Sequence, residues 1–88
     1  MKKKPAATIL IVDDFDDMRF LLREWLERRG YKVVEAVDGN EAIEVARRER
    51  PALILMDIGL PQRSGISATY KIRKVPELSG TPIVAVTA

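Results

Sequence analysis

The 88-residue chain contains neither cysteine nor histidine. Without cysteine it can form no disulfide framework and no thiolate metal site. Without histidine it has no imidazole metal ligand, no histidine-based catalytic triad and no phosphohistidine of its own. Any metal site must therefore be built from oxygen ligands, which select a hard cation, Mg²⁺ first and Mn²⁺ next.

The chain also lacks a long apolar run and a strong excess of charge. No stretch approaches the ~20 apolar residues of a membrane span, and the N-terminus has no signal-peptide core. We therefore expect a cytoplasmic protein without a membrane partner. The net charge of +2 is too small to indicate a nucleic-acid partner, which we expect only through a domain that this chain does not contain. The length allows one small domain, and residues 1–7, with Lys2-Lys3-Lys4, are predicted to be a basic, solvated tail.

Short apolar runs alternate with segments of helical periodicity. The pattern predicts an order βαβαβαβ, which indicates right-handed crossovers and an open parallel α/β sheet with helices on both faces. The predicted strands lie at 8–12, 31–37, 52–56 and 83–86, and the predicted helices at 16–29, 40–50 and 66–74.

Helical spacing also predicts which side chains face the core. In the first helix these are Met18, Leu21, Leu22, Trp25 and Leu26. In the third helix they are Ile66, Thr69 and Ile72. Asn40 is a plausible N-cap for the second helix.

Polar side chains follow three of the predicted strands. Asp13 and Asp14 follow one apolar run, Asp57 ends a second, and Thr87 follows a third. Any one of them alone is more often a turn or cap residue than a site. Ligands of open α/β sheets bind at the carboxyl ends of the strands, where the strand order reverses, so we expect these residues to converge. Three converging carboxylates repel one another and require a cation.

The chemistry of such a site favours phosphoryl transfer. Mg²⁺ usually takes one or two carboxylates together with phosphate oxygens and water. A carboxylate can itself accept a phosphoryl group, and in-line transfer requires mainly positioning and charge neutralisation.

Four motifs in order give a more specific identification. They are Ile-Val-Asp-Asp at 11–14, Asp38-Gly39 followed by Glu41-Ala42, Met56-Asp57 with Leu60-Pro61 and Gly65, and Val-Thr-Ala at 86–88. From Thr8 to Ala88 the chain resembles the receiver domain of two-component response regulators. The resemblance implies a flavodoxin-like, doubly wound parallel sheet. Residues 8–88 would contain its N-terminal two-thirds, with four strands and three helices but without the fifth strand, its lysine and the last two helices.

The resemblance also implies a role for each site residue. Asp57 would accept a phosphoryl group from a histidine kinase or phosphotransfer protein and would also face the metal. Asp14 would bind Mg²⁺ directly, Asp13 directly or through water, and Gly59 through its backbone carbonyl. Thr87 would hydrogen-bond the phosphoryl group and so change an interaction surface. The chain would not be an enzyme beyond its own phosphorylation and dephosphorylation.

Two other functions remain open. A receiver-like interaction module that is never phosphorylated is favoured by the missing lysine and opposed by the intact acids. An aspartyl-phosphate phosphatase would need a second acid two residues after the nucleophile, where this chain has Gly59. Because the strand at 83–86 would lie at an exposed edge, we also predict self-association or exchange of elements through it.

Overall fold

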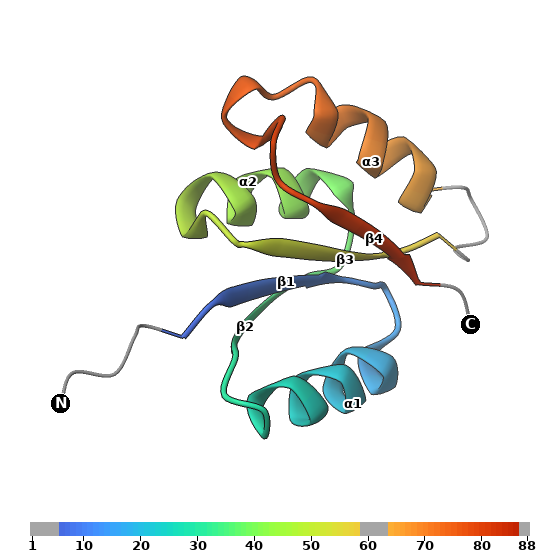
Figure 1. Cartoon of the computed structure of the whole chain (residues 1–88). Coiled ribbons are helices and arrows are strands. Elements are labelled where there is room, and N and C mark those ends of the chain that lie inside the picture. The colour runs from blue at the N-terminus through green and yellow to red at the C-terminus, as the bar shows by residue number, and fades with distance from the viewer. Residues whose placement is uncertain (1–5, 59–63, 87–88) are drawn as a thin grey trace, which may run out of the picture.

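A computed structural model describes residues 6–58 and 64–86 of the chain, and it shows a parallel sheet between two layers of helices (Figure 1). The strands are β1 (Thr8–Val12), β2 (Lys32–Ala36), β3 (Leu53–Asp57) and β4 (Ile83–Val86). The helices are α1 (Asp16–Glu27), α2 (Gly39–Glu49) and α3 (Ser64–Arg73), followed by the 3₁₀ turn η1 (Pro76–Leu78). Helix α1 covers one face, and α2 and α3 cover the other. The predicted α/β order and sheet are confirmed.

The strand order is β2-β1-β3-β4, and all pairs are parallel. The chain leaves β1 toward β2 on one side and returns to β3 on the other, so the order reverses between β1 and β3. In the register, Val12 pairs with Met56. The residues that follow them, Asp13 and Asp57, therefore lie at neighbouring strand ends.

Two apolar cores hold the layers together. The larger core lies under α2 and α3 and includes Leu10 and Val12, whereas the smaller core lies under α1 and includes Ile9 and Ile11. Because β1 supplies alternate side chains to both faces, it is apolar at every position after Thr8. This central strand anchors the loop that carries Asp13.

The core prediction for α1 is partly wrong. Leu26 is buried and Leu22 packs against the smaller core, but Leu21 is 61% exposed and Trp25 is 54% exposed. In the described part of the chain α1 is the one helix on its face, so only its sheet-facing stripe is covered. The Arg29 guanidinium lies 3.7 Å from the centroid of the Trp25 ring, so a cation–π contact covers part of the exposed indole.

Helices α2 and α3 differ from the prediction in detail. In α3, Ile72 is buried as predicted, but Ile66 is 58% exposed and Ala68 fills the core position instead. Helix α2 is capped by Asp38 rather than Asn40, because the Asp38 carboxylate accepts a hydrogen bond from the Glu41 N–H. The Glu41 carboxylate in turn accepts the Val37 N–H, which closes a reciprocal cap.

No helix within residues 6–58 and 64–86 combines the length and the apolar character needed to cross a membrane.

Candidate functional site

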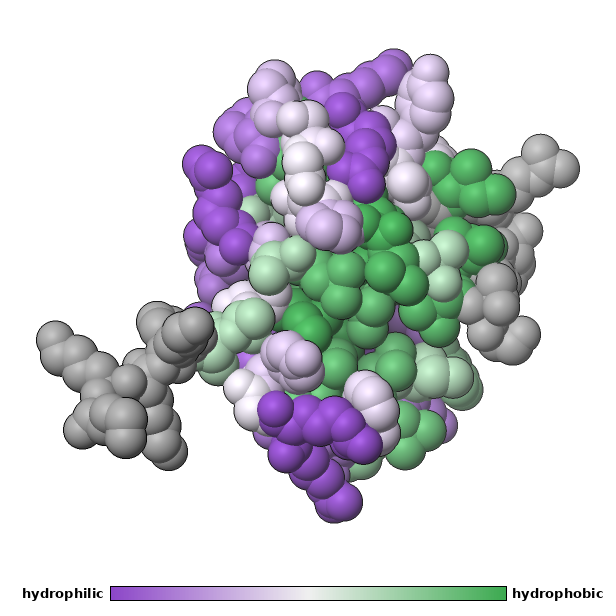
Figure 2. Space-filling view, in the orientation of Figure 1, coloured by the Kyte–Doolittle hydropathy of each residue, from purple (hydrophilic) through white to green (hydrophobic). Residues whose placement is uncertain are grey.

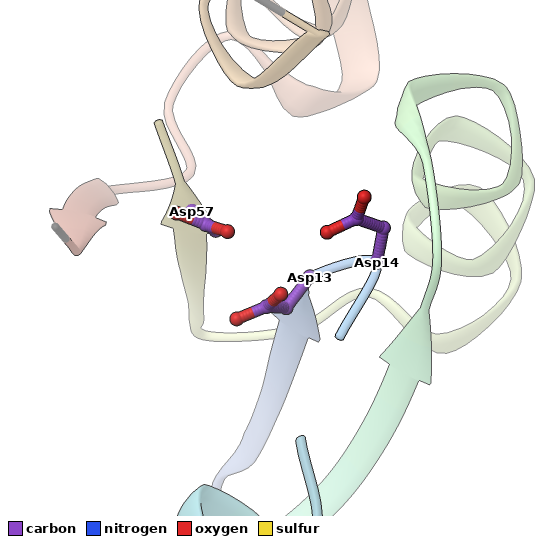
Figure 3. A group of neighbouring side chains, drawn as sticks. All are labelled: Asp13, Asp14 and Asp57. Atoms are coloured by element: carbon purple, nitrogen blue, oxygen red, sulfur yellow. The ribbon is translucent and has the colours of Figure 1, made fainter. Parts of the chain in front are cut away.

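Three carboxylates meet at the carboxyl edge of the sheet. Asp13 and Asp14 lie in the loop between β1 and α1, and Asp57 is the last residue of β3. Each offers a carboxylate oxygen, and these oxygens all lie within 4.8 Å of one another (Figure 3). The structure therefore brings together the three acids that strand-end placement predicted would converge.

The three acids differ in burial. The Asp13 side chain is buried, Asp57 is half-buried and Asp14 is exposed. Hydrogen bonds hold both the side chain and the backbone of Asp13. Its Oδ1 accepts the Phe15 N–H at 2.9 Å, and its own N–H donates to the Ala36 carbonyl at 3.1 Å. Within the site, Asp13 is therefore buried and fixed by hydrogen bonds, whereas Asp14 is open to solvent.

The electrostatics of the site disfavour a third negative charge. Burial raises the pKa of the Asp13 carboxyl, and the charge of Asp57, a hydrogen bond with it and the charge of Asp14 raise it further. The hydrogen bond from the Phe15 N–H acts in the opposite direction and is outweighed. A bound cation would relieve this repulsion, and the all-oxygen donor set of these carboxylates fits Mg²⁺ or Mn²⁺.

The other predicted site residues cannot be compared with the structure. Gly59, predicted to offer its carbonyl to the metal, and Thr87, predicted to contact the phosphoryl group, both lie outside the described residues. The same holds for Leu60-Pro61 in the loop after β3.

No role was predicted from the sequence for Arg19 or for its ion-pair partner Glu35. The Arg19 guanidinium contacts the backbone carbonyl of Asp13 and the carboxylate of Glu35. A signal was present, because Glu35 is a carboxylate in a strand whose next residue, Ala36, is fully buried. A half-buried carboxylate there needs a cationic partner.

A groove lies on the α3 side of the edge strand β4. Its volume is about 540 Å³, and its lining is largely apolar but includes two cationic side chains. The lining residues are Ile58, Ile66, Thr69, Tyr70, Arg73, Lys74, Ile83 and Ala85. Since Ile58 directly follows Asp57, the groove adjoins the strand end that carries this acid.

Comparison with known proteins gives one consistent family. The model of the response regulator receiver domain matches residues 9–88. The chain is 40% identical over 81 residues to protein PilH of Pseudomonas aeruginosa, covering 92% of this chain and 67% of that protein. It is 41% identical to the polar-differentiation response regulator DivK of Brucella anthropi, covering 92% of this chain and 66% of DivK. The chain thus spans about two-thirds of the length of these relatives.

Solved structures agree with the fold. The chemotaxis protein CheY4 of Vibrio cholerae superposes with a TM-score of 0.84 at 31% identity, over 91% of this chain and 67% of that one. The response regulator TrrA of Thermotoga maritima, solved in complex with Mg²⁺-BeF, has a TM-score of 0.81 at 34% identity, over 93% of this chain and 70% of that one. The predicted receiver fold is therefore confirmed.

Proposed function

The chain belongs to the response regulator receiver domain family, and we propose that residues 8–88, preceded by a basic tail at 1–7, act as its phosphoacceptor unit. In this proposal Asp57 receives a phosphoryl group from the phosphohistidine of a histidine kinase or phosphotransfer protein. The observation that carries the proposal is the convergence of Asp13, Asp14 and Asp57 at the carboxyl edge of the sheet. The half-buried Asp57 carboxylate lies close to both other acids, and this proximity supports charge-neutralised transfer better than a role in a turn or a cap.

In the proposed step, a carboxylate oxygen of Asp57 attacks the phosphorus of the donor. A new O–P bond forms as the N–P bond breaks, and the electron pair of that bond returns to the imidazole nitrogen of the donor. Mg²⁺, held by Asp13, Asp14, Asp57 and the carbonyl of Gly59, would neutralise charge on the phosphoryl oxygens. The product is an aspartyl phosphate on β3.

Thr87 is proposed to respond to the new charge. It directly follows Val86, and Val86 pairs with Asp57 in the register of β3 and β4. We propose that the Thr87 hydroxyl donates a hydrogen bond to a phosphoryl oxygen. This contact would couple phosphorylation to the outer strand of the sheet.

Intact mass spectrometry after incubation with acetyl phosphate tests the proposal. We expect one phosphoryl adduct that requires Mg²⁺ and disappears in Asp57→Asn. Asp38→Asn, which changes an acid outside the cluster, serves as control and should keep the adduct. A folded chain without an adduct, or an adduct that survives in Asp57→Asn, would contradict the assignment.

The second candidate function is a receiver-like interaction module that binds without phosphorylation. It is favoured by the exposure of β4, an edge strand of four apolar residues whose Val84 is 47% exposed. Figure 2 shows apolar side chains gathered over the middle of the molecule, where Figure 1 draws β3 and β4.

We propose that a second copy of the chain occupies this edge. The Ile83–Val86 strand carries no charge or proline that would block pairing with an identical strand. A two-fold related pair would join the two sheets and cover the same apolar surface on both copies. In the phosphoacceptor function this association would be sensitive to phosphorylation of Asp57, and in the module function it would be indifferent to it.

A further inference from the structure

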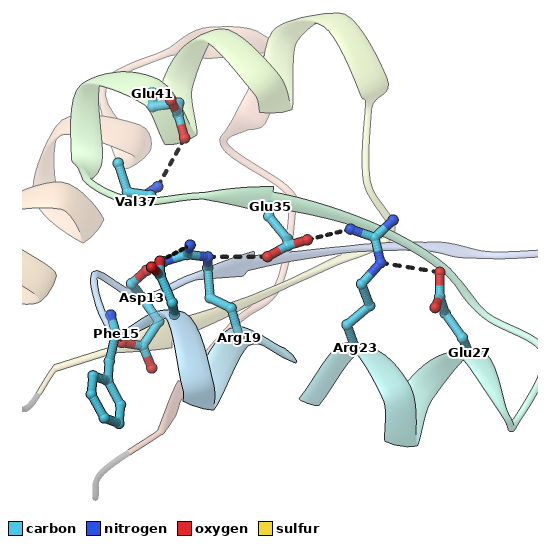
Figure 4. A network of polar contacts seen from close by, with 9 residues as sticks. Asp13, Phe15, Arg19, Arg23, Glu27, Glu35, Val37 and Glu41 are labelled. Carbon is cyan, nitrogen blue, oxygen red and sulfur yellow. Dashed lines mark hydrogen bonds and ion pairs between the residues drawn. The ribbon is translucent and has the colours of Figure 1, made fainter. Parts of the chain in front are cut away.

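We propose that Arg19 is a positioning residue for the acid site: it holds the peptide between Asp13 and Asp14 so that both carboxylates face Asp57. The inference rests on the proposed Mg²⁺-dependent function and concerns a residue of α1 that acts through the backbone of the acid loop. The Arg19 guanidinium reaches this backbone, with Nη1 donating to the Asp13 carbonyl oxygen at 2.7 Å (Figure 4). The Arg19 side chain is only 13% exposed, so this contact is largely shielded from water.

The position of Arg19 is itself fixed by β2. Its Nε donates to Glu35 Oε1 at 3.0 Å, and the other Glu35 oxygen accepts from Arg23 Nη1. Arg23 Nε in turn donates to Glu27 at 3.2 Å. Since β2 pairs with β1, with Glu35 opposite Ile11, this chain of ion pairs ties α1 to the strands that carry the site. Arg19 also contacts Asp16, but that carboxylate is 86% exposed and its pairing is weakened by solvent.

The Asp13 carbonyl is the informative contact because it belongs to the peptide that links the two loop acids. Rotation of this peptide would turn Asp13 and Asp14 away from Asp57, which is the movement that carboxylate repulsion favours. The Phe15 N–H restrains the Asp13 side chain, and Arg19 restrains the backbone behind it. Together they keep the oxygens gathered before a cation arrives, and such supporting contacts orient metal ligands in other sites.

Because Arg19 is positively charged, a positioning role and a simple electrostatic effect predict opposite changes in Mg²⁺ affinity when its charge is removed. A guanidinium near the site repels Mg²⁺, so removal of its charge alone would strengthen Mg²⁺ binding. Loss of a positioning contact would instead weaken binding, because free energy would then be needed to gather the carboxylates. The two effects of Arg19→Gln are opposite in direction.

Isothermal titration of the full chain with Mg²⁺ alone measures this difference without any phosphoryl donor. We expect Arg19→Gln to bind Mg²⁺ about tenfold more weakly than the wild type, the lower end of the loss typical of supporting-contact variants. Arg19→Lys should recover part of the affinity, because an ammonium can reach the Asp13 carbonyl but cannot bridge it to Glu35 with the same planar geometry. Arg23→Gln is the matched control, since it loses a Glu35 contact and leaves the Asp13 carbonyl contact intact.

The outcomes are separable when each variant is first shown to be folded by circular dichroism. Mg²⁺ affinity in Arg19→Gln equal to or greater than that of the wild type would overturn the proposal, as would an equal loss in Arg23→Gln. If Arg19→Gln does not fold, Arg19→Lys replaces it: the lysine keeps the positive charge, so a smaller weakening of Mg²⁺ binding is expected, and that weakening reports the changed contact geometry alone. A wild-type chain that binds no Mg²⁺ would contradict the proposed function itself. Equal Mg²⁺ binding by the wild type and the Arg19 variant would contradict only the role of Arg19.

Discussion

At the scale of a single residue, the charge of Asp13 that would bind a cation also lowers the stability of the fold. Among the residues that the structure describes, it is the one buried charged side chain. Burial and the neighbouring carboxylates raise its pKa, so the ionised form that would bind a cation is also the form that destabilises the fold. A cation bound by the three acids would remove this destabilisation, which agrees with the proposed Mg²⁺ site.

Asp13→Asn should therefore stabilise the chain at pH 7 in the absence of Mg²⁺. The amide keeps an oxygen acceptor for the Phe15 N–H but carries no charge. Because the pKa of Asp13 is higher in the folded than in the unfolded chain, wild-type stability is lost as the pH rises from the ordinary aspartate pKa through the raised pKa of the folded chain. The advantage of Asp13→Asn should thus be smaller near pH 4 than at pH 7.

Urea unfolding of both chains at the two pH values measures this advantage, with the exposed Glu44→Gln as control. An advantage of Asp13→Asn that is the same at both pH values would show that charge is not its cause. A variant less stable than the wild type at pH 7 would contradict the electrostatic account of the site.

Residue types at strand ends were sufficient to predict that Asp13, Asp14 and Asp57 meet, because in a parallel sheet the carboxyl ends of the strands share one edge. The contact between Arg19 and the Asp13 carbonyl could not be predicted in the same way. It depends on the angle at which α1 crosses the sheet and on the rotamer of a long side chain. Neither follows from the spacing of residues along the chain.

At the scale of elements, hydrophobic periodicity predicted the existence and order of the strands and helices but not how much of each helix is covered. It groups Leu21 and Trp25 with Leu22 and Leu26, yet only the last two contact the core. Periodicity reports which residues share a helix face, whereas the width of the buried stripe depends on neighbouring helices. Asp38 and not Asn40 caps α2, because the Asp38 carboxylate accepts the Glu41 N–H while the Glu41 carboxylate accepts the Val37 N–H.

The edge strand β4 is predicted to form the contact between two copies of the chain. We expect the chain to sediment as a dimer and Val84→Lys to sediment as a monomer, because a lysine on each of two paired edge strands places like charges close together and opposes their pairing. Leu21→Lys is the matched control: it makes the same kind of change at an exposed apolar position on α1 and should leave the dimer intact.

Sedimentation velocity over a range of concentrations distinguishes the outcomes. A wild-type chain that stays monomeric at the highest concentration would contradict association through β4. A dimer that dissociates in Leu21→Lys but not in Val84→Lys would indicate that the interface lies on α1 and not on β4.

At the scale of the whole molecule, the fold presents a compact acid site at one edge and a large apolar surface around β4. The order β2-β1-β3-β4 produces both features. It places β1 and β3 side by side, which gathers the acids, and it leaves β4 with one paired side in the described residues, which exposes Val84. The proposed phosphorylation site, Asp57, and the outer strand β4 thus meet in one register pair, since Asp57 lies opposite Val86.

The most direct test of the central claim is a crystal structure of the chain grown with Mg²⁺ and beryllium fluoride, the combination present in the related TrrA structure. We expect a beryllium fluoride group bonded to a carboxylate oxygen of Asp57, and a Mg²⁺ ion beside it bound by oxygens of Asp13 and Asp14. A folded chain in which Asp57 carries no such group, or in which the group and the ion lie away from the three acids, would contradict the claim that this edge of the sheet is a phosphoryl site.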